Sequence, residues 1–109
     1  MDNHLDTFFA ALSDPTRRAV IERLVSGPAS VSELHRDTDM ALPSFMKHVS
    51  KLESAGLIRS EKTGRTRMVQ LETAPLQQAE IWLTRQRRMW EGRMDRLQAM
   101  AETLERTPK

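Results

Sequence analysis

The chain has 109 residues and a formal net charge of +2, which is enough for one ordinary domain and too short for two. It contains no cysteine, which excludes disulfides, zinc fingers and thiol catalysis. No apolar run approaches the roughly 20 residues that cross a membrane, and the N-terminus lacks the pattern of a signal peptide. We therefore expect one cytoplasmic domain over residues 1–109.

Two helices are predicted at the start of the chain. Apolar residues recur at helical spacing over residues 4–12. Asp14 and Pro15 then supply an N-cap and a first helical residue for a second helix, which ends at Gly27-Pro28. We expect the buried face of this second helix to consist of Ala19, Val20, Leu24 and Val25.

A helix, a turn and a second helix follow. Ser30 and Glu33 have the spacing of a capping box, which opens a short helix reaching about Asp37. The next helix is predicted from Leu42-Pro43 to Ala55, with Gly56 as its stop. At about 100° per residue it has two faces. The apolar face packs on the core through Phe45, Val49 and Leu52, and the other face presents Ser44, Lys47, His48 and Lys51.

The charge is unevenly distributed along the chain. Residues 1–40 carry a net charge of −3, residues 41–72 carry +3 and residues 73–109 carry +2. The basic region therefore coincides with the second helix of the helix-turn-helix pattern. Its donors suit guanine O6 and N7 and the phosphates of a major groove, although a solvated charged face is the alternative. His48 has a further alternative, which is to cap a neighbouring carbonyl within the protein.

A β-hairpin is predicted after the basic helix. Residues 57–62 and 68–71 alternate as short strands, with a turn over residues 63–66 between them. Arg65 lies at the tip, where it can reach a phosphate or a minor groove. The other cations of the hairpin are Arg59, Lys62 and Arg67.

A long helix is predicted from Pro75 to about Leu104. Its apolar stripe comprises Leu76, Ala79, Leu83, Trp90, Met94, Leu97, Ala101 and Leu104, widened by Trp82, Met89 and Met100. A domain this small cannot cover such a stripe alone, which favours a homodimer. Trp82 and Trp90 are interpreted as packing residues, and an aromatic ligand pocket is the alternative.

This order of elements predicts a mainly α protein with a small β-hairpin. We expect a winged helix-turn-helix, with the helix-turn-helix over about 30–55, the wing over about 57–71 and a C-terminal dimerisation helix over about 75–104.

Three segments resemble the ArsR/SmtB family of bacterial repressors: A-L-S-D-P-T-R-R (11–18), S-F-M-K-H-V-S-K-L-E-S-A-G-L-I (44–58) and K-T-G-R-T-R (62–67). The resemblance implies a homodimer joined by its first and last helices, which represses transcription from an operator. The implied DNA contacts are Ser44, Lys47, His48, Lys51, Arg65 and Arg17, the last with an intramolecular ion pair as the alternative. The basic hairpin adds Lys62 and Arg67 as expected DNA contacts. The implied interface comprises Leu5, Phe8, Phe9, Leu83, Trp90, Met94, Leu97 and Leu104.

The departures from the family pattern concern metals. The helix before the basic helix contains no thiol, and no histidine follows His48. We therefore expect no metal and no cofactor, as in the metal-independent, autorepressor-like members. The alternatives are a repressor with an unidentified small-molecule or metal ligand, a protein-binding winged-helix module, and activation in place of repression. The chain has neither a glycine-rich phosphate loop nor a plausible catalytic set, so an enzyme is not expected.

Overall fold

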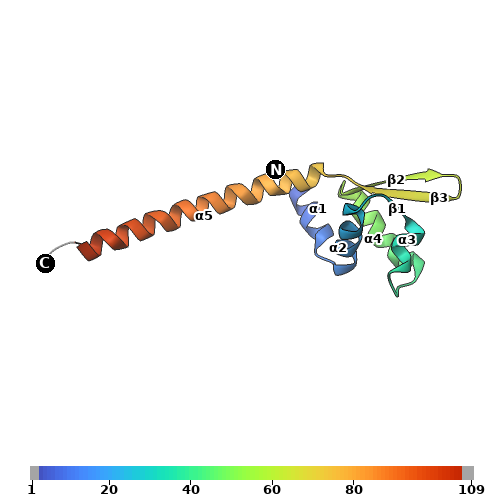
Figure 1. The fold of residues 1–109 in the computed structure, drawn as a ribbon, viewed down its shortest axis with the longest axis horizontal. Helices are drawn as coiled ribbons and strands as arrows, with labels where there is room; N and C mark the ends of the chain where they lie inside the picture. The colour runs from blue at the N-terminus through green and yellow to red at the C-terminus, as the bar shows by residue number, and fades with distance from the viewer. Residues whose placement is uncertain (1–2, 107–109) are drawn as a thin grey trace. The chain divides into compact units, whose positions relative to one another are not determined.

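The computed structural model describes residues 3–106, and these divide into two compact units, with the boundary between Gln78 and Ala79. The prediction of a single domain over 1–109 stays a prediction. The elements in chain order are α1 (Asn3–Leu12), α2 (Pro15–Val25), β1 (Ala29–Ser30), α3 (Val31–Arg36), α4 (Leu42–Ser54), β2 (Ile58–Thr63), β3 (Thr66–Leu71) and α5 (Ala74–Arg106). The described chain is therefore mainly helical with one small sheet (Figure 1).

Side-chain caps fix where α2 and α3 begin. The carboxylate of Asp14 accepts a hydrogen bond from the backbone N–H of Arg17 at 3.1 Å, and Pro15 occupies the first turn of α2. At α3 the Ser30 hydroxyl accepts from the Glu33 N–H at 3.1 Å, while the Glu33 carboxylate accepts from the Ser30 N–H at 3.0 Å. The predicted N-cap and capping box are both confirmed.

A Schellman motif ends α4 and directs the chain into β2. The N–H of Gly56 donates to the carbonyl of Glu53, and the N–H of Leu57 donates to the carbonyl of Leu52, both at 3.0 Å. Gly56 has a φ of +73°, which an L side chain rarely adopts. Leu52, before the turn, and Leu57, after it, are both fully buried, so both ends of the turn are held in the apolar core.

The sheet is antiparallel with strand order β1-β3-β2. The strands β2 and β3 run up to a two-residue turn at Gly64-Arg65, with Thr63 paired to Thr66. Gly64 has a φ of +63° and Arg65 does not have a positive φ, as in a turn that places glycine first. The predicted hairpin is therefore confirmed, with a longer second strand and a tighter turn.

The strand β1 was not predicted. It pairs Ala29 with Val69 and Ser30 with Met68. Two residues are too few to show an alternating pattern, and the strand exists only because β3 supplies the pairing partner.

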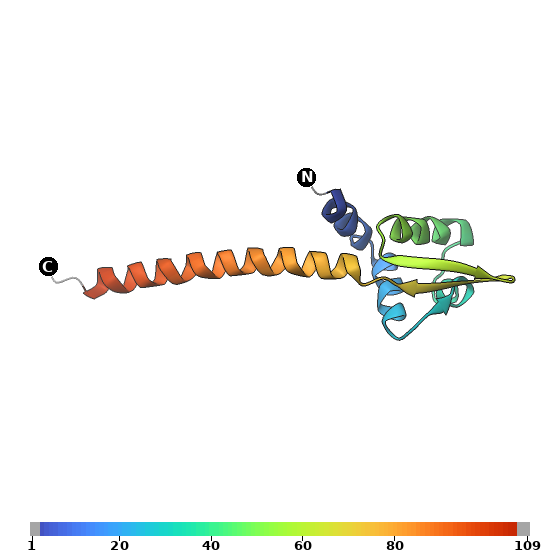
Figure 2. The ribbon, with the colours of Figure 1, turned by 90° about the horizontal axis from the view of Figure 1, so that it is seen from above.

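The core of the first unit lies where α4 meets the sheet. Its largest fully buried side chains are Phe45, Leu52, Leu57 and Val69. The predicted apolar face of α4 is confirmed, because Phe45, Val49 and Leu52 have exposed fractions of 0–2%. Figure 2 shows α4 running alongside the hairpin, which brings the basic helix and the wing together.

The predicted buried face of α2 is half wrong. Val20 and Leu24 are buried, but Ala19 is exposed and Val25 is 72% exposed. The third member of the buried face is Arg17, only 7% exposed. Its spacing of three and seven residues from Val20 and Leu24 places it on their stripe of the helix.

In α1 the two adjacent phenylalanines have different environments. Phe8 is 5% exposed and belongs to the core of the chain, whereas Phe9 is 40% exposed and Leu5 is half-buried. The rings of Phe8 and Phe9 meet edge to face with centroids 5.2 Å apart. The predicted interface role of Phe8 is therefore corrected, because its side chain is already covered within one chain.

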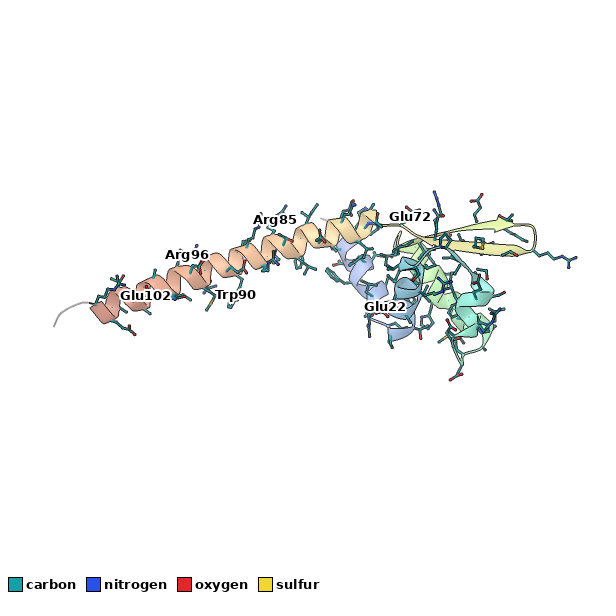
Figure 3. The ribbon with its side chains drawn as sticks, in the orientation of Figure 1. Glu22, Glu72, Arg85, Trp90, Arg96 and Glu102 are labelled. Carbon is teal, nitrogen blue, oxygen red and sulfur yellow. The ribbon has the colours of Figure 1, made fainter. Side chains whose placement is uncertain are left out.

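The helix α5 extends over 33 residues and confirms the predicted long helix. Ala79 is its one buried residue in the part that the structure describes. Figure 3 shows Trp90 projecting from one side of α5 and Arg85 from the other. Over residues 3–106, no helix combines the length and the apolar character needed to span a membrane.

Candidate nucleic-acid interface

The outer face of α4 presents polar and cationic side chains. Ser44, Lys47 and Lys51 are exposed, while the side chain of His48 is 22% exposed and lies at the edge of this face. The face exists because Phe45, Val49 and Leu52 turn the opposite side of the helix into the core. It offers a hydroxyl, ammonium groups and an imidazole, which are hydrogen-bond donors for base edges and phosphates.

Lys51 lies on the side of α4 that borders α1. It lines a cavity of about 490 Å³ between α1 and α4, and Asp6 of α1 lines the same cavity. Lys47, one turn earlier, does not line this cavity.

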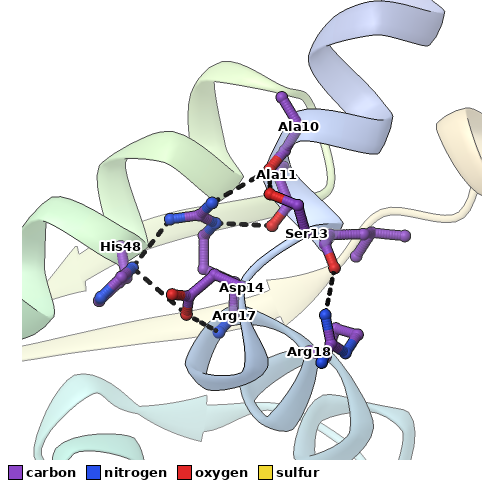
Figure 4. A network of polar contacts seen from close by, with 8 residues as sticks. Ala10, Ala11, Ser13, Asp14, Arg17, Arg18 and His48 are labelled. Carbon is purple, nitrogen blue, oxygen red and sulfur yellow. Dashed lines mark hydrogen bonds and ion pairs between the residues drawn. The ribbon is translucent and has the colours of Figure 1, made fainter.

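Arg17 does not belong to the exposed basic surface. Its Nε donates to the carbonyl of Ala11 at 2.6 Å and its Nη2 to the carbonyl of Ala10 at 3.0 Å. Its Nη1 lies 2.9 Å from Nδ1 of His48 (Figure 4). Because the guanidinium is buried and directed at these acceptors, the predicted DNA contact by Arg17 is corrected to a role inside the protein.

Asp14 completes this polar network. Its Oδ2 accepts from the Arg17 N–H and lies 3.7 Å from Nδ1 of His48. Partial burial raises the pKa of Asp14, but hydrogen bonds from the backbone N–H groups of Arg17 and Thr16, with the charge of Arg17, lower it by more, so the pKa lies below its ordinary value. Asp14 therefore stays ionised at neutral pH and fixes a negative charge beside α4.

The wing places two cations opposite each other. Lys62 of β2 pairs directly with Arg67 of β3, and both are exposed. Like charges in directly opposite positions destabilise an antiparallel pair. Because side chains two residues apart share a face of a strand, Lys62 and Arg67 lie on the face that also carries Ser60 and the buried Val69.

A short chain of hydrogen bonds joins this wing face to α4. Nη1 of Arg67 donates to the Ser60 hydroxyl at 3.1 Å, and this hydroxyl donates to Oε2 of Glu53 at 3.1 Å. Glu53 lies in the last turn of α4. The orientation of the wing is thus tied to the basic helix, so the cations of both elements belong to one surface.

The remaining wing cations differ in their partners. Arg59 lies on the other face of β2 and pairs with Glu72 at 3.3 Å. Arg65 is exposed at the tip of the hairpin. Among the ion pairs found over residues 3–106, none involves Lys47, Lys62 or Arg65. These three cations are therefore available to an external anion.

The contributions of Glu53, Ser60 and Asp14 were not predicted. Glu53 and Ser60 are seven residues apart, and they meet only because the Schellman turn folds β2 back beside α4. Asp14 was identified as a cap, but its position beside His48 depends on how α2 packs against α4.

Histidine 35 has a structural role in the turn between α3 and α4. Its Nε2 lies 2.8 Å from the carbonyl of Met40, and its ring packs against Phe45 with centroids 5.4 Å apart. Within the described residues, no three His, Cys, Asp or Glu side chains gather in the arrangement that a metal ion requires.

A basic helix held beside a basic two-stranded hairpin defines a winged helix-turn-helix regulator. Residues 12–61 match the family model of a helix-turn-helix domain. A solved ArsR family transcriptional regulator is 53% identical, with a TM-score of 0.79 over 82% of this chain and 92% of that chain.

Two curated relatives agree with this class. The HTH-type transcriptional regulator Rv2034 of Mycobacterium tuberculosis is 39% identical over 65% of this chain and 66% of its own length. The transcriptional repressor SdpR of Bacillus subtilis is 28% identical over 72% of this chain and 88% of its own length. The chain belongs to the ArsR family of winged helix-turn-helix transcriptional regulators, and its relatives are regulators and not enzymes.

Proposed function

We propose that this regulator is a sequence-specific repressor that binds duplex DNA as a homodimer on an inverted repeat, in the cytoplasm and on the nucleoid of a bacterium. The observation that carries the proposal is the direct pairing of Lys62 with Arg67 beside the exposed face of α4. Two facing cations weaken the free wing, and a phosphate between them would relieve their repulsion.

The two elements have different tasks in this proposal. Ser44 and Lys47 on α4 enter a major groove and contact base edges, while Arg65, Lys62 and Arg67 hold phosphates or a narrow minor groove. Base contacts discriminate sequences, and phosphate contacts bind all duplexes alike.

The exposed stripe of α5 supports the homodimer. Leu76, Leu83, Trp90, Leu97 and Leu104 recur every seven residues, and the last four are 49–69% exposed. Met94 is 43% exposed on the same stripe. A continuous apolar face of this length indicates a helical partner. A second copy of this chain supplies an identical stripe, to which Leu5 and Phe9 of α1 are added.

The division of tasks is tested on an operator selected by the protein from random duplexes. Lys47→Ala is expected to cost about 1–3 kcal/mol on the operator and much less on a scrambled duplex. Arg65→Ala is expected to weaken both duplexes alike and to reduce the salt slope by about one. Arg59→Ala is the matched control, since Arg59 is paired with Glu72 on the other face of the wing.

Several outcomes would overturn the assignment. Equal losses of Lys47→Ala on both duplexes would remove α4 as the base-reading element. Failure of the unmodified protein to select any duplex would favour the protein-binding module instead. Selected half-sites are expected about 10 base pairs apart or a multiple of that distance, because two recognition helices enter successive major grooves.

The repressor is proposed to need no metal. The helix before α4 offers no thiolate ligand, and the last helix offers no imidazole ligand, because the first lacks cysteine and the second lacks histidine. Operator affinity is expected to agree within about tenfold, or 1.4 kcal/mol, between chelator and added zinc, nickel or cadmium. A larger change would show that metal binding is coupled to DNA binding.

A further inference from the structure

The contact between Arg17 and His48 constrains the protonation of a DNA-facing side chain. A guanidinium can only donate hydrogen bonds. At 2.9 Å from Nη1 of Arg17, Nδ1 of His48 must therefore be the acceptor and carry no proton. The proton of the neutral ring is then on Nε2, which makes Nε2 a donor.

The buried setting of Arg17 makes this constraint firm. Its guanidinium is held on the other side by the carbonyls of Ala10 and Ala11, at 3.0 and 2.6 Å. These carbonyls belong to α1, His48 belongs to α4 and Arg17 belongs to α2, so three helices determine the direction of the bond. Arg17 as a whole is only 7% exposed. Its guanidinium therefore cannot rotate away from His48 without leaving a buried hydrogen-bond donor unsatisfied.

The second nitrogen of the ring points outward. Figure 4 shows it directed away from Arg17 and Asp14. The hydrogen bonds found over residues 3–106 include none at Nε2 of His48, and no buried side-chain nitrogen or oxygen there lacks a partner. Nε2 therefore reaches the surface at the edge of the α4 face that carries Ser44 and Lys47.

We propose that Arg17 is a positioning residue that holds His48 as the Nε2–H tautomer, so that His48 acts as a hydrogen-bond donor toward duplex DNA. This inference rests on the proposed function of the chain as a DNA-binding regulator. In a major groove, a donor selects guanine N7 and O6, adenine N7 and thymine O4, and it rejects the amino groups of adenine and cytosine. His48 is thereby a specificity-determining residue, and Arg17 sets which specificity it has.

The tautomer is tested first in the free protein. A long-range proton–nitrogen correlation spectrum is expected to show His48 with a bare Nδ1 and a protonated Nε2 near pH 8. Arg17→Lys is expected to give a mixture of tautomers, because an ammonium lacks the planar fork. Arg18→Lys is the matched control, since Arg18 is exposed and its Nη1 donates to the carbonyl of Leu12. An Nδ1–H tautomer in the unmodified protein would overturn the proposal.

Two substitutions of His48 then test the donor on DNA. Glutamine places its amide near the position of Nε2, and asparagine places it near Nδ1. His48→Gln is expected to keep operator affinity within about threefold, whereas His48→Asn is expected to lose about tenfold or more. Equal losses in both variants, or no loss in either, would overturn the role of Nε2 as a donor.

Coupling and modified DNA complete the test. Arg17→Lys is expected to lose operator affinity without a further loss when it is combined with His48→Asn. Additive losses would mean that Arg17 acts through folding alone, which thermal unfolding of the same variants measures. Single guanines of the operator are replaced by 7-deazaguanine, and single phosphates by methylphosphonates. At the one operator position that His48 contacts, the replacement should abolish the affinity difference between the unmodified protein and His48→Asn. A base position supports the proposal, and a phosphate position removes the specificity role.

The two proposals can fail separately. If the unmodified chain binds no duplex but shows the Nε2–H tautomer, the proposed function fails while the pairing of Arg17 with His48 stands. If the chain selects an operator and His48 has the other tautomer, only this further inference fails.

Discussion

The helices α4 and α5 are both amphipathic, but they differ in what covers their apolar faces. In α4 the side chains of Phe45, Val49 and Leu52 are 0–2% exposed, because the same chain packs over them. In α5 the large apolar side chains of residues 81–104 are 38–69% exposed. The same sequence pattern therefore serves two purposes. One helix uses its apolar face to present a polar face outward, and we propose that the other presents its apolar face to a partner.

The strongest test of this contrast is a charge on the α5 stripe. Leu97→Glu is expected to raise the dimer dissociation constant by about 10²- to 10⁴-fold, because two apolar side chains leave the interface at roughly 1.5–3 kcal/mol each. Sedimentation equilibrium measures the change. Ala99→Glu makes the matched substitution on the opposite side of the helix and should leave the dimer intact. A monomeric unmodified protein at micromolar concentration would refute the interface.

The corresponding test on α4 affects folding. Phe45→Ala is expected to lower the free energy of unfolding by about 3–5 kcal/mol, because it removes a fully buried ring from the core. Urea unfolding followed by circular dichroism provides the measurement. The neighbouring Ser44→Ala is exposed and should change stability by less than about 0.5 kcal/mol. A small effect of Phe45→Ala would mean that α4 is not anchored by its apolar face.

In the wing, the facing cations are expected to lower the free energy of unfolding and to raise DNA affinity. Lys62→Gln removes one member of the like-charged pair, so the free energy of unfolding should rise by about 0.2–1 kcal/mol while DNA affinity falls. Arg59→Gln is the control with the opposite sign, because it breaks the 3.3 Å ion pair with Glu72 and leaves DNA binding unchanged. Lower stability of Lys62→Gln would show that the facing cations do not repel each other.

The smallest expected effect concerns the capping box of α3. The hydrogen bonds from the Ser30 N–H and hydroxyl, together with the charges of Arg23 and Arg36, outweigh partial burial and hold the pKa of Glu33 below its ordinary value. A carboxylate whose pKa is lower in the folded state stabilises the protein at pH values above its unfolded pKa. This stabilisation is lost as the pH falls through the folded pKa. The stability advantage over Glu33→Gln should therefore be present at pH 7 and decline once the pH falls below the ordinary glutamate pKa of about 4.3. Glu22→Gln, an exposed change on α2, is the control. An advantage independent of pH would indicate that the charge of Glu33 is not involved.

The sequence predicts best what depends on neighbouring residues. The caps at Asp14 and Ser30, the stop at Gly56 and the hairpin turn each need only a few adjacent residues, and all are confirmed. The apolar face of α4 follows from the helical period of 3.6 residues per turn alone. These elements fix the order helix, turn, helix and hairpin, from which the class of protein follows.

Features that depend on distant partners were missed. For Arg17 the sequence left a DNA contact and an intramolecular ion pair open, because nothing nearby in the sequence shows the carbonyls of α1 and the imidazole of α4 that satisfy it. Val25 was assigned to the core because it is apolar, but it is 72% exposed. The strand β1 needed the pairing surface of β3. In each case the deciding contact joins residues that lie far apart along the chain.

The two-residue turn at Gly64-Arg65 limits how such a wing can change length. With Thr63 paired to Thr66, the hairpin has no bulge, and every residue pair alternates between its two faces. One pair inserted at the base would turn Lys62 and Arg67 to the face that carries Arg59, away from α4. Only two pairs, which add about 7 Å at roughly 3.4 Å per residue, keep the cations on their side. Wings that preserve this surface should therefore vary by multiples of four residues, so that length and charge placement are inherited together.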